Sequence, residues 1–172
     1  EQGLGYLQFS TDLYGMVLAL LDRQEASVPD KIRQVFARSR EFLSEFRNSA
    51  DGSLPPIGEG EHECALSSSM HFSGSTKVQA PGLTTFHLSG YSIIRGRKHE
   101  KAIFDHGPLG MAPRYAHGHA DALSLFLQVG SRDVLIDPGT YTFTGQEEWR
   151  RYFRGTRAHN TVTVDGLDQA IQ

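Results

Sequence analysis

The spacing of apolar side chains divides the chain into a helical first part and a strand-rich second part. In the first 50 residues they recur at steps of three and four, which is the period of an amphipathic helix. This spacing predicts one helix over residues 6–21 and a second that starts after Val28-Pro29-Asp30 and ends before residues 48–52. The predicted apolar stripes are Tyr6, Phe9, Leu13, Met16, Val17, Leu20 and Leu21, and then Ile32, Val35, Phe36, Leu43 and Phe46. A hairpin of two such helices has one apolar face, which needs further partners to bury it.

Beyond a connecting region, the apolar positions follow the shorter period of β-strands. Residues 51–60 have the composition of a loop, and residues 61–81 show no sustained period. Strand-like runs lie at residues 84–88, 91–95, 102–105, 123–129, 134–136 and 161–164, and residues 146–154 could form a short helix. The sequence therefore predicts an α+β fold, with helices and a connecting loop in residues 1–80 and the start of an antiparallel β-sandwich in residues 81–172.

One predicted hairpin brings two candidate metal ligands together. The apolar runs at 123–129 and 134–136 are separated by Gly130-Ser131, so the second run folds back on the first. The ends of the hairpin then meet, and His119 should lie close to Asp137. Pro138-Gly139 suits the central positions of a type II turn, because Pro presets φ and Gly accepts a positive φ. We therefore expect Asp137 to be held at a rigid strand end.

Two sets of side chains are candidates for a metal site. His159 precedes the last strand-like run and would be the third ligand beside His119 and Asp137. Two imidazoles and one carboxylate suit Zn²⁺ better than Mg²⁺ or Ca²⁺, which prefer oxygen ligands. Alternatively, His117, His119 and Asp121 share one face of an extended segment, because side chains alternate with period two. A third interpretation is a set of ordinary hydrogen-bonded polar residues at a sheet edge.

Four arginines within eight positions form a second candidate site. Arginine pairs bidentately with carboxylates and sulfates, so this cluster could bind an anionic glycan. It could equally form a solvated face paired with Glu147 and Glu148. The arginines are Arg150, Arg151, Arg154 and Arg157.

Length, charge and composition exclude several partners. The net charge is −3 and no nucleic-acid-binding motif accompanies the arginines, so no nucleic acid is expected as a partner. No apolar run approaches the roughly 20 residues of a membrane span. The single cysteine, Cys64, excludes an intrachain disulfide. The chain has 172 residues, begins with Glu1 and ends after a turn-like segment, so we expect it to be an internal piece of a longer protein. The oligomeric state is not indicated.

Several ordered motifs resemble one family of enzymes. They are HGHADALS at 117–124, DPGTYTF at 137–143, WRRYFRGTRAHNTV at 149–162 and DGLDQ at 165–169, with looser counterparts EQGLGY at 1–6 and DGSLPPIGEGE at 51–61. Together they are similar to the heparinase II/III and oligo-alginate lyase families, most closely to the alginate lyase branch of bacterial exopolysaccharide systems.

The resemblance implies a fold and an activity. Residues 1–50 would be the last helices of an α/α toroid, followed by an antiparallel β-sandwich. The activity would be that of a carbon–oxygen lyase that cleaves uronic-acid polysaccharide by β-elimination, in the periplasm or after secretion. A fragment without the rest of the toroid is expected to be inactive.

Residue by residue, the resemblance places Zn²⁺ on His119, Asp137 and His159, and it places His117 near the substrate and Tyr6 in catalysis. Arg150 and Arg154 are the candidates for binding the anionic glycan. Without the resemblance, Tyr6 would be assigned to the apolar stripe of the first helix. Leu7 and Gly3 stand where the family has histidine and serine. A zinc-dependent glycan hydrolase and a non-catalytic carbohydrate-binding protein therefore remain as alternatives.

Overall fold

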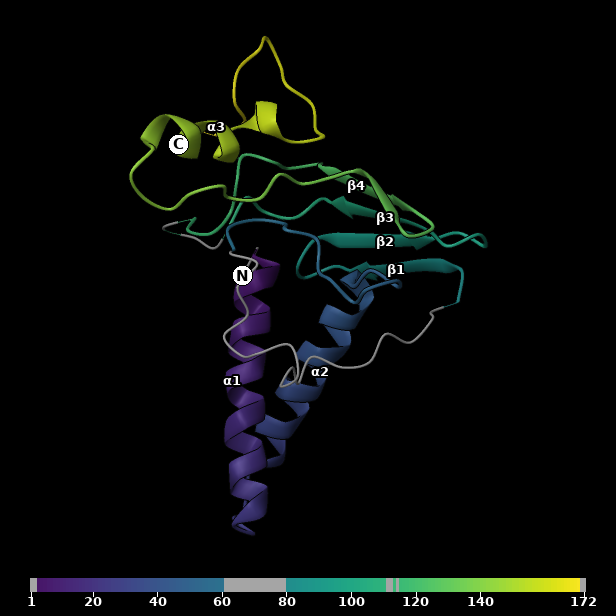
Figure 1. Ribbon diagram of the computed structural model, residues 1–172, viewed down its shortest axis with the longest axis vertical. Helices are drawn as coiled ribbons and strands as arrows, with labels where there is room; N and C mark the ends of the chain where they lie inside the picture. Colours follow the sequence, from purple (N-terminus) through teal and green to yellow (C-terminus); the bar gives the residue numbers. More distant parts are fainter. Residues whose placement is uncertain (1–2, 61–79, 111–112, 114, 171–172) are drawn as a thin grey trace.

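The computed structural model describes residues 3–60, 80–110, 113 and 115–170 (Figure 1). Two helices come first, a five-stranded sheet follows, and a short helix with a 3₁₀ turn closes the described chain. The helices are α1 (Leu4–Arg23), α2 (Asp30–Phe46) and α3 (Glu147–Arg154), and the 3₁₀ turn is η2 (Thr156–Ala158). The strands are β1 (Gly82–Phe86), β2 (Tyr91–Arg95), β3 (Glu100–Asp105), β4 (Leu125–Val129) and β5 (Arg132–Leu135).

Both predicted helices form, but the predicted stripe of α1 faces outward. Phe9, Leu13, Met16, Val17 and Leu20 are all exposed in this chain. The buried positions of α1 are Leu4, Gln8, Thr11, Asp12, Gly15 and Leu18. The period identified the helix correctly, whereas the side that this chain covers is set by α2 and the loop after it. By length and composition alone, α1 is also a candidate membrane span, although none was predicted from the apolar runs of the sequence.

The five strands form an antiparallel meander in the order β1-β2-β3-β4-β5. Ile93, Ile103 and Phe126 are direct partners across three strands and are buried in one row. This row packs with Leu4, Phe46 and Ile57 in the main core. The opposite face carries a second apolar row, formed by Leu83, Ile94, Ala102, Leu127 and Leu135. A sheet that is apolar on both faces is the first layer of a sandwich, as predicted.

Two cationic side chains of the sheet, buried Lys101 and partly buried Arg95, join it to the end of α2. The Lys101 ammonium donates to the carbonyls of Phe46 at 2.8 Å and Arg47 at 2.6 Å. Arg95 pairs with Glu45 and donates to its carbonyl. Positive charge at a helix C-terminus is favourable because the last carbonyls have no partners within the helix. Burial nevertheless lowers the pKa of Lys101 to about 8. The sheet consequently lies at the end of the hairpin where α1 begins and α2 ends (Figure 1).

The prediction of a sixth strand at residues 161–164 is wrong. This segment is irregular, and only Val164 and Leu167 form an isolated bridge. Side chains hold it in place of a strand ladder: Asn160 Nδ2 donates to the Ile136 carbonyl at 2.7 Å, and Thr161 Oγ1 donates to the Ala122 carbonyl. The Leu125 N–H also donates to the Asn160 carbonyl. The segment therefore still returns to the start of β4, which is what positions His159. The predicted domain boundary near residue 80 adjoins residues 61–79, outside the described residues, and stays a prediction.

Candidate active site and metal centre

The structure brings together His119, Asp137 and His159, the first of the two candidate ligand sets predicted from the sequence. One ligand atom from each residue lies within 4.8 Å of the other two. The β4–β5 hairpin turns at Gly130-Ser131 and pairs Val129 with Arg132, so its ends meet as predicted. The three residues are almost fully buried, with exposed fractions of 2%, 4% and 8%.

Hydrogen bonds fix the orientation of two of the three candidate ligands. Asp137 Oδ1 accepts the Gly139 N–H at 2.9 Å, and Gly139 has the positive φ of +68° that the predicted turn needs. His159 Nε2 lies 3.1 Å from the Phe153 carbonyl, which can only accept, so Nε2 carries the proton. In a neutral ring, Nδ1 then presents its lone pair to Asp137 Oδ2, 3.3 Å away. Two acceptors face each other at this distance unless a proton or a metal ion lies between them.

The donor set fits a bound metal ion. Both ring nitrogens of His119, Nδ1 of His159 and Oδ2 of Asp137 are buried, and none has a hydrogen-bond partner among the described residues. Burial lowers the pKa of His119 to about 4, so its imidazole is neutral and available as a ligand. Burial also disfavours charge on His159, but its contact with Asp137 raises the net pKa of this ring. A cation among these atoms would satisfy them together.

The local set of His117, His119 and Asp121 is not brought together. His117 has a φ of +65°, which breaks the extended alternation on which that set depended. Its Nδ1 lies toward Glu59 instead. Asp121 is buried near the triad without belonging to it, and burial together with Asp137 raises its pKa to about 7.

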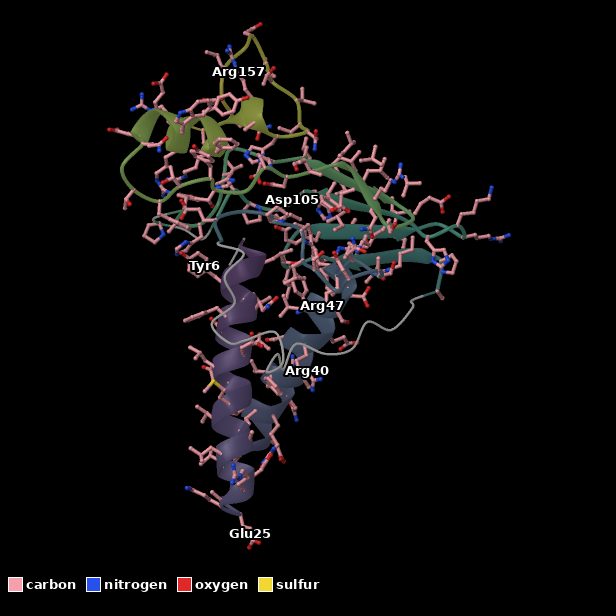
Figure 2. All side chains as sticks on the ribbon, viewed as in Figure 1. Tyr6, Glu25, Arg40, Arg47, Asp105 and Arg157 are labelled. Carbon is pink, nitrogen blue, oxygen red and sulfur yellow. The ribbon has the colours of Figure 1, made fainter. Side chains whose placement is uncertain are left out.

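His117 and Tyr6 form a pair at the junction of the helical and strand-rich parts. Their ring centroids are 4.1 Å apart with the planes inclined by 52°. Figure 2 shows Tyr6 at the end of α1 that meets the loops of the strand-rich part. Gly118 is needed beside His117, because a Cβ there would lie 1.6 Å from the Leu109 carbonyl oxygen. This close approach holds the HGH segment against the preceding loop.

Glu59 contacts His117 of this pair, and it was not predicted as a site residue from the sequence. Its side chain is 6% exposed, and Oε2 lies 3.3 Å from His117 Nδ1. Its N–H donates to the His117 carbonyl at 2.8 Å. The loop that carries it was recognised by resemblance, but a single glutamate in a loop gives no signal of a role.

The four arginines have three different environments. Arg150 pairs with Glu59, and Arg154 Nε lies 3.6 Å from the same carboxylate, so both proposed substrate-binding arginines reach the site. Arg151 forms an exposed pair with Glu147, as the solvated-face interpretation expected. Arg157, in η2, donates to the Gly166 carbonyl of the last loop at 3.0 Å, and Figure 2 labels it at this end of the molecule. The cluster is thus divided between the site and the surface.

Two aromatic features flank the site. Tyr141, Trp149, Tyr152 and Phe153 form a cluster with centroid distances of 5.0–6.1 Å, and Trp149 is half exposed. Leu7 lines a groove of about 620 Å³ between α1, α2 and β1, together with Phe42 and Phe86. Leu7 therefore occupies an apolar position and does not belong to the Tyr6–His117 pair.

The chain combines a helical hairpin with the first sheet of a β-sandwich, and histidine and arginine side chains lie at the junction between them. This two-part architecture has counterparts among known families and structures. A family model described as heparinase II/III-like, C-terminal, matches residues 78–172, more than half of the chain, and the chain belongs to this family. No curated protein matches the chain.

Solved structures have the same fold over nearly the whole chain. Heparan sulfate lyase HepC from Pedobacter heparinus aligns with a TM-score of 0.77 at 16% identity over 98% of this chain. A structure of heparinase III aligns with a TM-score of 0.77 at 16% identity over 96% of the chain. A heparinase III with methylated lysines gives 0.76 at 18% identity over 98%. The chain spans 30%, 31% and 29% of these three structures, respectively.

Proposed function

We propose that the full-length protein is a polysaccharide lyase that cleaves uronic-acid chains by β-elimination. The observation that carries the proposal is the Tyr6–His117 pair. Both groups are suited to proton transfer, their ring centroids are 4.1 Å apart, and Arg150 and Arg154 lie nearby against Glu59. Membership of the heparinase II/III-like family and the fold shared with heparan sulfate lyase HepC support it.

β-Elimination needs a base at C5 of the uronate and an acid at the departing O4. His117 takes the C5 proton, and the electrons of the C5–H bond form the C4–C5 double bond. The C4–O4 bond breaks, and O4 leaves with the neighbouring sugar after taking a proton from Tyr6. The positive charge of Arg150 and Arg154 that Glu59 does not neutralise holds the uronate carboxylate, which makes the C5 proton more acidic.

A zinc ion held by His119, Asp137 and His159 would supply structural cross-linking of the strand-rich part. The near-complete burial of the three side chains supports this role over a hydrolytic one, because a hydrolytic metal needs an open position for water. The sheet, which Lys101 joins to α2, and the three metal ligands would together hold the HGH segment in place next to the substrate.

The finer assignments rest on the resemblance. We propose an alginate-type or exopolysaccharide uronan as the substrate and a periplasmic or secreted location. Leu7, where the family has histidine, favours one competing function, a carbohydrate-binding protein without catalysis. Leu7 lines a groove with Phe42 and Phe86, and Tyr6 and His117 keep their arrangement without a histidine at position 7.

The test uses the full-length protein with alginate, heparan sulfate and bacterial exopolysaccharide uronans. Ultraviolet absorbance follows the unsaturated uronate that only elimination creates. A rise in absorbance supports the lyase and identifies the polymer. New reducing ends without the absorbance would show a hydrolase, and binding without either product would show a carbohydrate-binding protein.

A further inference from the structure

Glu59 is the point where four segments of the chain meet. Its carboxylate contacts His117 of the HGH segment and two of the three arginines of α3, Arg150 and Arg154, and its N–H donates to the His117 carbonyl. On the other side, the start of α1 lies so close that a Cβ at Gly3 would be 2.5 Å from the Glu59 carbonyl oxygen. The position of Glu59 is therefore fixed by its main chain.

Neighbouring main-chain contacts fix the same loop. The Leu4 N–H donates to the Ile57 carbonyl at 3.3 Å, and the Gly60 N–H donates to Thr140 Oγ1 at 3.3 Å. The loop is thus tied to α1 on one side and to the turn after Asp137 on the other. A carboxylate on such a rigid loop can orient the groups it touches.

The contact with His117 determines which nitrogen meets a substrate. Nδ1 of His117 is buried and lies 3.3 Å from Glu59 Oε2, at ion-pair distance but without hydrogen-bond geometry, whereas 34% of the whole side chain remains exposed. Nε2 is consequently the nitrogen left for the substrate. A carboxylate beside Nδ1 favours the tautomer that has its proton there, so Nε2 presents a lone pair.

The contacts with Arg150 and Arg154 determine the charge of the site. One carboxylate faces two guanidinium groups, so Glu59, Arg150 and Arg154 together carry a formal net charge of about +1. A single surplus positive charge matches the single carboxylate of one uronate residue. Without Glu59 the surplus would be two, and anionic chains would be held more tightly.

We propose that Glu59 is the positioning residue of this site, which orients His117 through Nδ1 and neutralises one of the two guanidinium groups so that one remains for the uronate. This proposal rests on the proposed lyase function. It adds to that function a residue that raises turnover and weakens substrate binding. Glu59 itself does not touch the substrate.

The test compares Glu59→Gln, Glu59→Asp and wild type in the full-length protein, with the uronan that gives the unsaturated product. Glu59→Gln keeps the shape and removes the charge, so we expect kcat to fall about 10- to 100-fold and KM to fall about threefold at low salt. KM of this variant should also depend more steeply on salt. Glu59→Asp keeps the charge and should restore KM to the wild-type value and part of kcat.

Glu147→Gln is the matched control, because Glu147 is a fully solvated glutamate that pairs with Arg151 on the outer side of α3. It should leave kcat and KM unchanged. A fall in kcat with a rise in KM and a lower melting temperature, shared by both Glu59 variants, would show a merely structural role and overturn the proposal. Wild-type kcat and KM in Glu59→Gln would overturn it as well.

Equilibrium binding separates this proposal from the proposed function. Titration with alginate and heparan sulfate oligosaccharides measures affinity whether or not turnover occurs. If wild type forms no unsaturated product but Glu59→Gln binds an oligosaccharide about threefold more tightly, the lyase function fails and the charge role of Glu59 stands. Equal affinities of the two proteins would refute the charge role.

Discussion

The imidazole of His117 lies against the phenol ring of Tyr6, with 4.1 Å between the ring centroids, although the two residues come from opposite parts of the fold. Tyr6 is on α1, and His117 is on the segment that leads into β4. The proposed acid and base therefore depend on the packing of the helical part against the strand-rich part. Neither part would be expected to catalyse elimination alone.

Replacing His117 with alanine should abolish turnover and leave the metal in place. His117 lies toward Glu59 and Tyr6 rather than toward the ligand atoms of His119 and His159. We expect kcat to fall at least about 100-fold, as for loss of a general base. The measurements are the absorbance assay and the zinc content by mass spectrometry. His106→Ala, at an exposed histidine that contacts Ser92, is the control. An active His117→Ala variant would refute the assignment.

Replacing His159 with alanine should lower metal content and melting temperature together. The variant removes one of three ligands and leaves Asp137 Oδ2 buried without it, so metal affinity should fall on the order of 100-fold or more. A chelator should lower the melting temperature of wild type more than that of the variant. His87→Ala changes an exposed histidine and should alter neither quantity. Unchanged melting with stoichiometric zinc would remove His159 from the site.

Replacing Asp105 with asparagine should stabilise the protein at high pH but not at low pH. Burial raises the pKa of Asp105 to about 6, so in the range from about 4 to 6 the folded state binds more protons than the unfolded state. The contribution of Asp105 to stability is thus present at low pH and lost as pH rises through 6. The asparagine variant avoids this loss, by up to about 3 kcal/mol.

The check is the difference in melting temperature between Asp105→Asn and wild type at pH 5 and pH 8. The gain should be larger at pH 8. Asparagine can still accept the Gly107 N–H, which donates to Asp105 Oδ1 at 2.8 Å. Asp30→Asn, at an exposed position, should show no such trend. An equal shift at both pH values would contradict the prediction.

Replacing Lys101 with methionine should weaken the attachment of the sheet to α2. Methionine keeps most of the apolar stem but loses both hydrogen bonds to the carbonyls of Phe46 and Arg47. We expect a loss of about 2 kcal/mol, because the lost charged bonds outweigh the desolvation of the ammonium. Thermal unfolding measures it, with exposed Lys98→Met as the control. If both variants melt at the same temperature, the contact with α2 has no net value.

Local sequence signals were sufficient to predict most of the helices and strands. They were not sufficient to predict structure that depends on contacts between distant segments. Gly130-Ser131 between two apolar runs predicted the β4–β5 hairpin, since turn chemistry acts over a few residues. The run at 161–164 is rich in β-branched residues and was predicted as a strand, but the side chains of Asn160 and Thr161 take the place of a ladder. Such competition is decided by tertiary contacts.

The candidate site shows the same limit. Spacing left two metal-ligand sets open, and the left-handed φ of His117, which excludes the local one, is imposed by packing and cannot be read from neighbouring residues. Glu59 was missed because its role arises from partners on two other segments, the HGH segment and α3. The period of α1 likewise identified a helix but not which side this chain would cover.

Trp149 is the only tryptophan among the 172 residues, and it precedes Arg150 on α3. Its indole is half exposed and contacts the rings of Tyr141 and Phe153, while Arg150 reaches Glu59. A glycan carboxylate bound beside Arg150 and Arg154 would change the water around the indole, because Trp149 is next to Arg150 in the chain. This segment therefore contains its own optical probe, whose emission wavelength would follow glycan binding at Arg150 and Arg154 without any added label.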